Sequence, residues 1–411
     1  MHSLRFTLCV GALFLGTSAL DAQQSTDSTA RAAAPARAPG AYMNVSFVGL
    51  TSAGTSTARD LDRLQVGDHD PRVRGFTVPN AELALDGAVD PYFKGFINIV
   101  HKLDAAGETG VELEEMYVLS TALPNNLQLK VGQFFTEFGR HNPQHPHSWA
   151  FADAPLVLGR LLGPEALRSQ GARVSWLLPT PIFAEATFAV LNSAGGTAAP
   201  FRSEESSLIH GGTPIERGVE DAKDLLYVPR LSTSFDPTST QTIVIGASGA
   251  FGPNNSGPDA STRVLGADLY WKWKSPTAHQ GFPFIAFQSE VLTRRYEAAT
   301  RFWEDDGITV LPASTLNDVG GYAQVQWGIK PMLVAALRAE SLQRDDNAPV
   351  GITGPDREDR ARFSTNLTWF PSEYSKFRVQ YNYDHRNALG NDSSIWFQLE
   401  FLLGAHAAHK F

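Results

Sequence analysis

The chain has 411 residues, of which 43% are hydrophobic and 19% are charged, and its formal net charge is -9. An acidic chain of this kind is not expected to bind nucleic acid as its main role. A mean hydropathy of -0.18 is typical of a soluble protein. A β-barrel with a polar interior gives the same value, however, because only alternate strand residues face lipid.

Residues 1–22 have the pattern of a secretory signal peptide. Arg5 supplies a positive charge, residues 6–20 form an apolar run, and Ala22 ends a small-residue cleavage motif. The apolar run is shorter than the roughly 20 residues of a transmembrane helix. We therefore expect export through the inner membrane and removal of this segment.

Residues 23–40 are rich in Ser, Thr, Ala, Pro and Arg and show no apolar periodicity. This composition predicts a disordered periplasmic leader before the first strand, and we assign residues 41–411 to one barrel domain. The single cysteine, Cys9, lies in the predicted signal peptide, so the mature chain would contain none.

From residue 41 onward, short segments with two-residue periodicity follow one another, and no run of eighteen apolar residues occurs. Such segments predict an all-β transmembrane antiparallel barrel, because a tilted membrane strand needs about 9–11 residues. The predicted strands are 42–50, 76–88, 92–103, 111–122, 127–135, 170–178, 182–192, 224–236, 240–252, 262–274, 282–296, 316–329, 332–343, 360–371, 374–386 and 393–411.

The connections between these segments alternate in length. Those after even-numbered strands are tight turns rich in Pro, Asp and Asn, with one longer exception at 275–281. The largest connections after odd-numbered strands are 51–75, 136–169, 193–223, 297–315 and 344–359. Short turns at one end and long loops at the other are typical of outer-membrane barrels, with the turns in the periplasm.

The strand 374–386 shows the expected alternation clearly. Phe377, Val379 and Tyr381 share one face, whereas Lys376 and Arg378 lie on the other. A charge facing lipid at the bilayer midplane costs about 2–4 kcal/mol, so the polar faces are predicted to line water. A large soluble β-sandwich is the alternative, but it does not account for an outer band of aromatic residues.

The segment 111–122 breaks this alternation. Glu112, Glu114 and Glu115 occupy both faces. We therefore expect a β-bulge or an extension beyond the membrane at this position.

Three features resemble the general and phosphate-selective porins, including the porin O and P-like group. They are the hairpin from Glu82–Gly87 to Asp90–Gly95, the segment Lys130–Phe134 before a long loop, and an alternating last strand that ends in Phe411. The resemblance covers the mature length and implies a bacterial outer-membrane porin whose third loop folds into the lumen. It also implies Phe411 as the assembly signal, a homotrimer, and contact with lipid, lipopolysaccharide and the barrel-assembly machinery.

The third loop, 136–169, is predicted to form the pore constriction. Its apolar run at 155–162 needs a wall to pack against. The candidate constriction residues are Arg140, His141, His145, His147, Asp153 and Arg160.

Three of these residues, His141, His145 and His147, could bind a metal such as Zn²⁺. Alternatively, they belong to a polar loop and hydrogen-bond the barrel wall. No other cofactor is expected.

Basic residues outnumber acidic ones on the predicted lumen face, which favours a mild preference for anions. The lumen candidates are Lys94, Lys130, Arg230, Lys272, Arg338, Arg362, Arg378, Glu82, Asp268 and Glu400. The predicted function is passive diffusion of small hydrophilic solutes.

A metal-responsive or metal-uptake channel using the loop histidines is the alternative function. An outer-membrane barrel enzyme ranks lower, because no Gly-x-Ser-x-Gly or similar signature occurs, and we name no catalytic residue.

Overall fold

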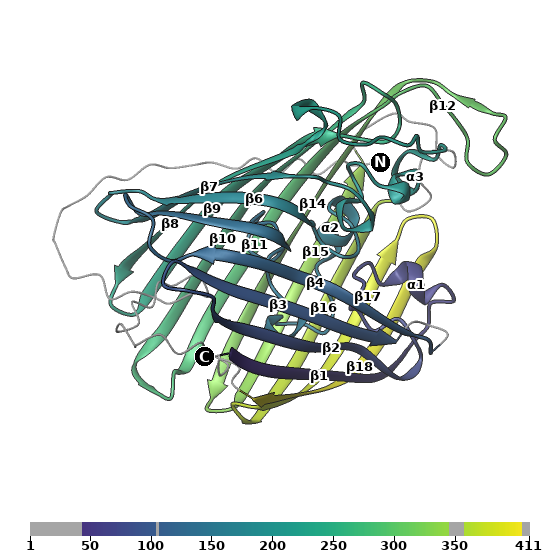
Figure 1. The fold of residues 1–411 in the computed structure, drawn as a ribbon. Helices are drawn as coiled ribbons and strands as arrows, with labels where there is room; N and C mark the ends of the chain where they lie inside the picture. Colours follow the sequence, from purple (N-terminus) through teal and green to yellow (C-terminus); the bar gives the residue numbers. More distant parts are fainter. Residues whose placement is uncertain (1–42, 104–106, 345–356, 405–411) are drawn as a thin grey trace. The chain divides into compact units, whose positions relative to one another are not determined.

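Sixteen antiparallel strands close into a barrel in the computed structural model, which describes residues 43–103, 107–344 and 357–404 (Figure 1). Each barrel strand pairs with the strands before and after it, and β1 pairs with β18 to complete the ring. Closure pairs the first and last strands with each other, so that neither is left as an open edge of the sheet. The predicted fold class is confirmed.

The barrel strands are β1 (Met43–Ser56), β2 (Gly75–Ala88), β3 (Phe93–Leu103), β4 (Thr109–Ser120), β5 (Leu127–Phe135), β6 (Arg168–Leu177), β7 (Phe183–Leu191), β8 (Leu226–Thr238), β9 (Gln241–Pro253), β10 (Ser261–His279), β11 (Phe282–Ala298), β14 (Ser314–Lys330), β15 (Leu333–Arg344), β16 (Arg360–Ser372), β17 (Ser375–Arg386) and β18 (Gly390–Gly404). The connections carry α1 (Leu61–Leu64), α2 (Leu156–Leu161), α3 (Ser207–His210), four short 3₁₀ turns at Pro146–Ser148, Gly196–Ala198, Glu204–Ser206 and Ala222–Asp224, and a small ladder of β12 (Arg301–Phe302) with β13 (Val310–Leu311).

All sixteen predicted strands are present, and two boundaries differ notably. β1 continues to Ser56, because the small residues after Leu50 still pair with β18 and β2. β10 continues to His279, so the predicted long connection at 275–281 was wrong. The turn there consists of Gln280 and Gly281, with φ of 52° and 82°, and two-residue hairpin loops favour such positive angles.

The connections sort by length as predicted. Those from β2 to β3, β8 to β9, β10 to β11 and β14 to β15 are short, whereas residues 57–74, 136–167, 192–225 and 299–313 lie at the other end of the strands. The predictions for 1–22, 23–40 and Phe411 lie outside the described residues. No helix in the described ranges is long and apolar enough to cross a membrane.

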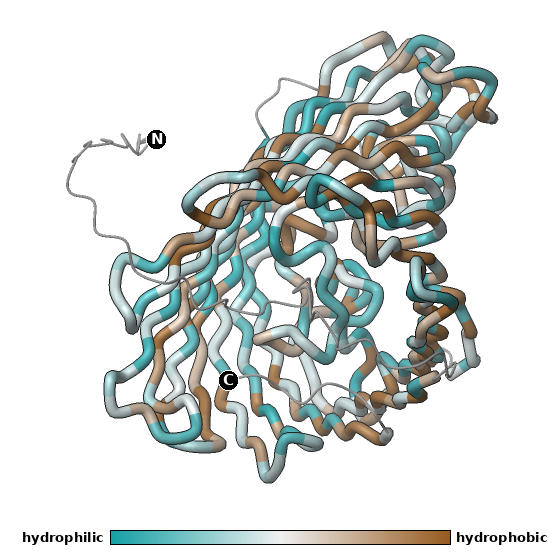
Figure 2. Tube along the Cα trace, turned by 60° about the vertical axis from the view of Figure 1, so that its left-hand side comes forward, coloured by the Kyte–Doolittle hydropathy of each residue, from teal (hydrophilic) through white to brown (hydrophobic). Residues whose placement is uncertain are grey.

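The exposed positions of the strands are largely apolar and the buried positions are largely polar, which gives the barrel an apolar outward face and a largely polar inward face. Hydrophobic and hydrophilic residues are accordingly interspersed along the strands (Figure 2). On β17, Phe377, Val379 and Tyr381 are exposed, whereas Gln380 and Asn382 are fully buried. The same alternation holds on β10, β16 and β18, which confirms the predicted parity. Strand pairing therefore directs one side-chain set outward and the other into the barrel.

The expected β-bulge is present in β4. Asn98 pairs with Glu115 and the next residue, Ile99, pairs with Leu113, which leaves Glu114 as the extra residue. Both Glu114 and Glu115 are buried, so the bulge turns two consecutive carboxylates to the same side of the strand.

Gly132 of β5 allows the close approach of β4 and β5. Its φ is 140°, and a Cβ there would lie 2.1 Å from the carbonyl oxygen of Met116. Gly132→Ala should lower the free energy of unfolding by about 1–3 kcal/mol, because the backbone conformation and the contact both exclude a side chain. Denaturant unfolding of the protein in lipid vesicles measures this change.

Gly218→Ala is the matched control, because open space surrounds Gly218 and its φ is not positive. It should change stability by less than about 0.5 kcal/mol. Equal effects of the two substitutions would contradict the assignment.

Candidate functional site: the inner loop of the barrel

Residues 136–167, which connect β5 to β6 and are called the inner loop here, cross the barrel interior. The N–H of His141 donates to Glu290 Oε1 of β11 at 2.8 Å. Four residues later, His145 Nε2 lies 2.9 Å from Glu115 Oε2 of β4. Because β10, β9, β8, β7, β6 and β5 lie between β11 and β4, these contacts join widely separated parts of the wall. The prediction that the third loop folds into the barrel is confirmed.

The side chain of Asp153 is fully buried and accepts hydrogen bonds from four residues of the wall. Its Oδ2 accepts from Arg362 Nη1 at 3.1 Å and from Asn382 Nδ2 at 2.6 Å. Its Oδ1 accepts from Gln380 Nε2 at 2.9 Å and also from Arg338. The buried carboxylate therefore meets two guanidinium groups and two amides, which come from β15, β16 and β17.

The loop backbone is held along the same wall. Lys376 Nζ donates to the carbonyl of His147 at 2.6 Å, and Arg378 Nη2 donates to the carbonyl of Trp149 at 2.7 Å. Farther along, the N–H of Leu156 donates to a carboxylate oxygen of β15 at 2.6 Å. These bonds satisfy backbone groups that a buried loop would otherwise leave unpaired.

The other side of the inner loop is apolar. Helix α2 contributes Leu156, Val157, Leu158 and Leu161 to a buried cluster that includes inward side chains of β7, β8, β9, β10, β11, β14 and β15. The predicted apolar run at 155–162 therefore packs on the barrel wall. Removal of this apolar area from water stabilises the loop inside the barrel.

The bulge on β4 and a residue of β2 form a cluster with two loop histidines. This histidine–glutamate cluster consists of Glu82, Glu114, Glu115, His145 and His147. His145 Nδ1 lies 3.0 Å from Glu114 Oε2, and His147 Nδ1 lies 3.0 Å from Glu82 Oε2. Burial lowers the pKa of His145, but the carboxylates of Glu114 and Glu82 outweigh it, so that its pKa lies well above 6.5.

The three histidines predicted as metal ligands do not gather. His145 and His147 stack with ring centroids 5.7 Å apart, whereas His141 packs against Trp149 and Tyr322. Within the described ranges, no group of three or more His, Cys, Asp or Glu side chains is arranged to hold a metal ion. The wall contacts of His145 and His147 match the alternative interpretation of the loop.

The connection 57–74 also enters the barrel, although its sequence pattern did not predict this. Arg362 Nη2 donates to the carbonyl of Leu64 at 2.9 Å, and Asp70 Oδ1 accepts from the N–H of Ala154 at 2.8 Å. His69 Nε2 lies 3.4 Å from Glu114 Oε1. Leu61 and Leu64, isolated in a polar segment and now packed against Trp396, were the available signal.

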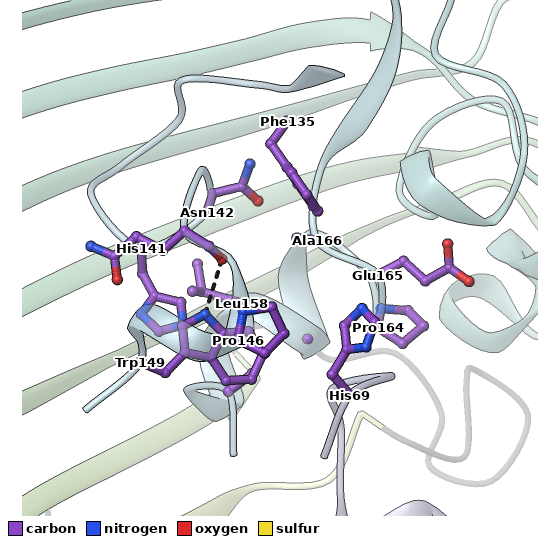
Figure 3. Close-up of a pocket in the computed structure, with 14 residues that line it drawn as sticks. His69, Phe135, His141, Asn142, Pro146, Trp149, Leu158, Pro164, Glu165 and Ala166 are labelled. Carbon is purple, nitrogen blue, oxygen red and sulfur yellow. Dashed lines mark hydrogen bonds between the residues drawn. The ribbon is translucent and has the colours of Figure 1, made fainter. Parts of the chain in front are cut away.

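A cavity of about 30 Å³ lies between the inner loop and His69 (Figure 3). Phe135, His141, Trp149 and Leu158 are among its lining residues. A space of this size holds about one water molecule, so it is too small to bind a solute.

Most predicted lumen residues do not line open water, and this part of the prediction was wrong. Glu82, Asp268, Arg338, Arg362, Arg378 and Glu400 are buried, whereas Lys130, Arg230 and Lys272 are half-buried and Lys94 is exposed.

The basic side chains do not line open water because they form ion pairs inside the barrel. Arg230 meets Asp268 at 2.6 Å, Lys376 meets Glu400 at 2.8 Å, and Lys130 meets Glu137 of the inner loop at 2.7 Å. Asp268 and Glu400 were among the predicted lumen residues, whereas Glu137, which the inner loop brings to the wall, was not.

The remaining predicted constriction residues lie at opposite ends of the loop. The guanidinium of Arg140 lies 3.9 Å from the ring centroid of Tyr270. Arg160 Nη1 donates to the carbonyl of Glu358 at 3.3 Å, and its own carbonyl accepts from Arg294 at 2.8 Å. Both residues therefore also attach the loop to its surroundings.

A protein of Aquifex aeolicus (strain VF5), described as an uncharacterized protein, is 32% identical to this chain over 355 residues, which cover 82% of this chain and 70% of that protein. The chain belongs to the family of this Aquifex protein. No family model matches it.

Solved structures share the fold at low sequence identity. The outer membrane channel DcaP of Acinetobacter baumannii is 11% identical, with a TM-score of 0.56 over 88% of this chain and 97% of that one. An anion-selective porin from Comamonas acidovorans is 8% identical, with a TM-score of 0.53 over 89% and 100%. The trimer form of OmpT, an outer membrane protein of Vibrio cholerae, is 8% identical, with a TM-score of 0.53 over 89% of this chain and 100% of that one. These porins and channels have the barrel in common with this chain, and none of the three descriptions names an enzymatic activity.

The raised pKa of His145 predicts a pH-dependent contribution to stability. This contribution is full below pH 6.5, the ordinary histidine pKa, and is lost as the pH rises through the higher folded value. The stability difference between the wild type and His145→Gln should therefore be larger at pH 6 than above the folded pKa. Thermal unfolding over this pH range measures it.

His210→Gln is the control, because burial lowers the pKa of His210 to about 3. Its difference from the wild type should change in the opposite direction, because the wild type loses stability as the pH falls through 6.5, the ordinary histidine pKa. It should be constant above about pH 7.5. A pH-independent effect of His145→Gln would contradict the ionised histidine–glutamate cluster.

Proposed function

We propose that this chain forms a channel in the bacterial outer membrane, through which small hydrophilic solutes diffuse passively. The closed barrel with an apolar outer face and a polar inner face is the observation that carries this proposal. The likeness to barrels described as porins and channels supports it. The proposed location agrees with the predicted signal peptide and with the short and long ends of the barrel.

The inner loop governs passage in this proposal. It contacts widely separated strands, and its contacts are of two kinds, a buried ionic set around Asp153 and an apolar set around α2. Solutes then pass beside the loop or after part of it moves. Conduction therefore depends on how firmly Asp153 holds the loop to the wall.

Several finer features belong to the same proposal. A homotrimer agrees with the trimer form described for OmpT, and no enzymatic activity is proposed. Contact with lipopolysaccharide and assembly by the barrel machinery follow from the proposed location. A mild anion preference would arise from Lys94 and Lys272, two less buried basic residues of the predicted lumen set.

Conductance in planar lipid bilayers tests the proposal. The wild type should give discrete ion currents, and Asp153→Asn should give larger ones, because Arg338 and Arg362 lose their shared anion. The same substitution should lower stability by about 3–5 kcal/mol, as expected when a buried ion pair loses one partner.

Asp259→Asn is the matched control, because Asp259 is exposed in the connection between β9 and β10. It should leave both current and stability unchanged. Folded wild type and folded Asp153→Asn that both carry no current would contradict the channel.

A further inference from the structure

The barrel wall contains a carboxylate-binding arrangement that the inner loop fills. Four donors face one point, namely Arg338 of β15, Arg362 of β16, and Gln380 and Asn382 of β17. Strand register brings them together, since Ser364 pairs with both Arg338 and Asn382 across the ladder. In the structure the carboxylate at this point is the side chain of Asp153.

The donors are positioned by the wall itself. Arg362 Nε lies 2.8 Å from Asp384 Oδ1, and Arg338 is ion-paired with Glu340 on its own strand. Gln380 Nε2 also donates to Asn382 Oδ1 at 2.9 Å. Because the residues that hold the four donors belong to the strands, the donors keep their positions when Asp153 is replaced. Guanidinium groups fixed in this way match the planar geometry of a carboxylate.

The charge around this point favours an anion. Three guanidinium groups, those of Arg338, Arg360 and Arg362, face the two wall carboxylates of Glu340 and Asp384. Without Asp153, the wall set therefore keeps one excess positive charge.

Asp70 of the connection 57–74 is the other acid near Asp153. Burial and the neighbouring charge of Asp153 raise the pKa of Asp70 to about 7. The carboxylate of Asp70 is bonded to the N–H groups of Gly67 and Ala154, and not to the four donors around Asp153.

We propose that Arg338, Arg362, Gln380 and Asn382 form a binding site for solutes that carry a carboxylate, and that Asp153 occupies it as a tethered competitor. A solute carboxylate that displaces Asp153 frees the segment of the inner loop around residues 150–154. Lys376 and Arg378, which donate to loop carbonyls in this structure, then become available as donors to the solute. The binding site does not depend on the proposed channel. The effect of solute binding on conduction rests on the proposed function.

Rescue by acetate tests the site without any measurement of current. Asp153→Ala removes the competitor and leaves room for a free carboxylate. Acetate at a concentration a hundred-fold above its dissociation constant should increase the stability of this variant, because acetate binds only the folded state. The wild type should show no such increase, because Asp153 already fills the site. We expect acetate to raise the melting temperature of Asp153→Ala, and the uncharged analogue acetamide to leave it unchanged.

Two further variants sharpen the test. Glu137→Gln removes one negative charge from the same loop, but Glu137 lies beside Lys130 and Arg173 and not at the four donors. It should show no acetate response. Asp153→Ala with Arg362→Gln should lose most of the response, by about ten-fold or more in apparent affinity.

Asp153→Ser, which also leaves room for a free carboxylate, serves as a second variant if Asp153→Ala does not fold. Equal responses to acetate and acetamide, or a response of Glu137→Gln as large as that of Asp153→Ala, would overturn the proposal. A stabilising effect of acetate in a protein that carries no current would keep the site and reject the channel.

Discussion

The constraint on which the structure depends is that a charge buried inside the barrel needs an opposite charge beside it. Isolation of an ion from water costs several kcal/mol even after relaxation, and pairing with good geometry offsets this cost. The wall strands β15, β16 and β17 point arginines inward, and Asp153, Glu340 and Asp384 face them. Because Asp153 belongs to the inner loop, the charges of the wall are balanced only when the loop is in place.

The loop meets the barrel through two kinds of contact. Around Asp153 the contacts with β15, β16 and β17 are ionic, whereas α2 and Phe138 join an apolar cluster with inward residues of β7 to β11, β14 and β15. The ionic side is directional and sensitive to the loss of a single charge. The apolar side is non-directional and tolerates small displacements. A solute that competes for the ionic side would therefore loosen the loop while the apolar side keeps it inside the barrel.

The fold was readable from the sequence because period-two alternation is a local property. The outward positions of β17, such as Phe377 and Tyr381, were assigned correctly, and the irregular glutamates of 111–122 correctly indicated a bulge. The end of β10 was not predicted, because its last residues are polar and the turn is formed by Gln280 and Gly281. That difference is one of turn geometry, which alternation does not encode.

The site was only partly readable, because parity gives the face of a residue but not its partner. Arg338 and Arg362 were placed correctly inside the barrel, yet they contact Asp153, 185 and 209 residues earlier in the chain. The entry of residues 57–74 was missed for the same reason. The histidines of the loop illustrate the limit, since spacing grouped three of them and the structure separates His141 from the other two.

Chemical labelling of the inner loop tests the central claim, which is that this loop is held inside the barrel. With Cys9 replaced by serine, a cysteine would be placed at Ala152, which is buried beside Gln380, or at the exposed Asp305. In vesicles, a membrane-impermeant maleimide should label Ala152→Cys at least about ten-fold more slowly than Asp305→Cys, because labelling requires local opening. Labelling of both positions at the same rate would show that the loop does not lie packed against the wall, and would contradict the account.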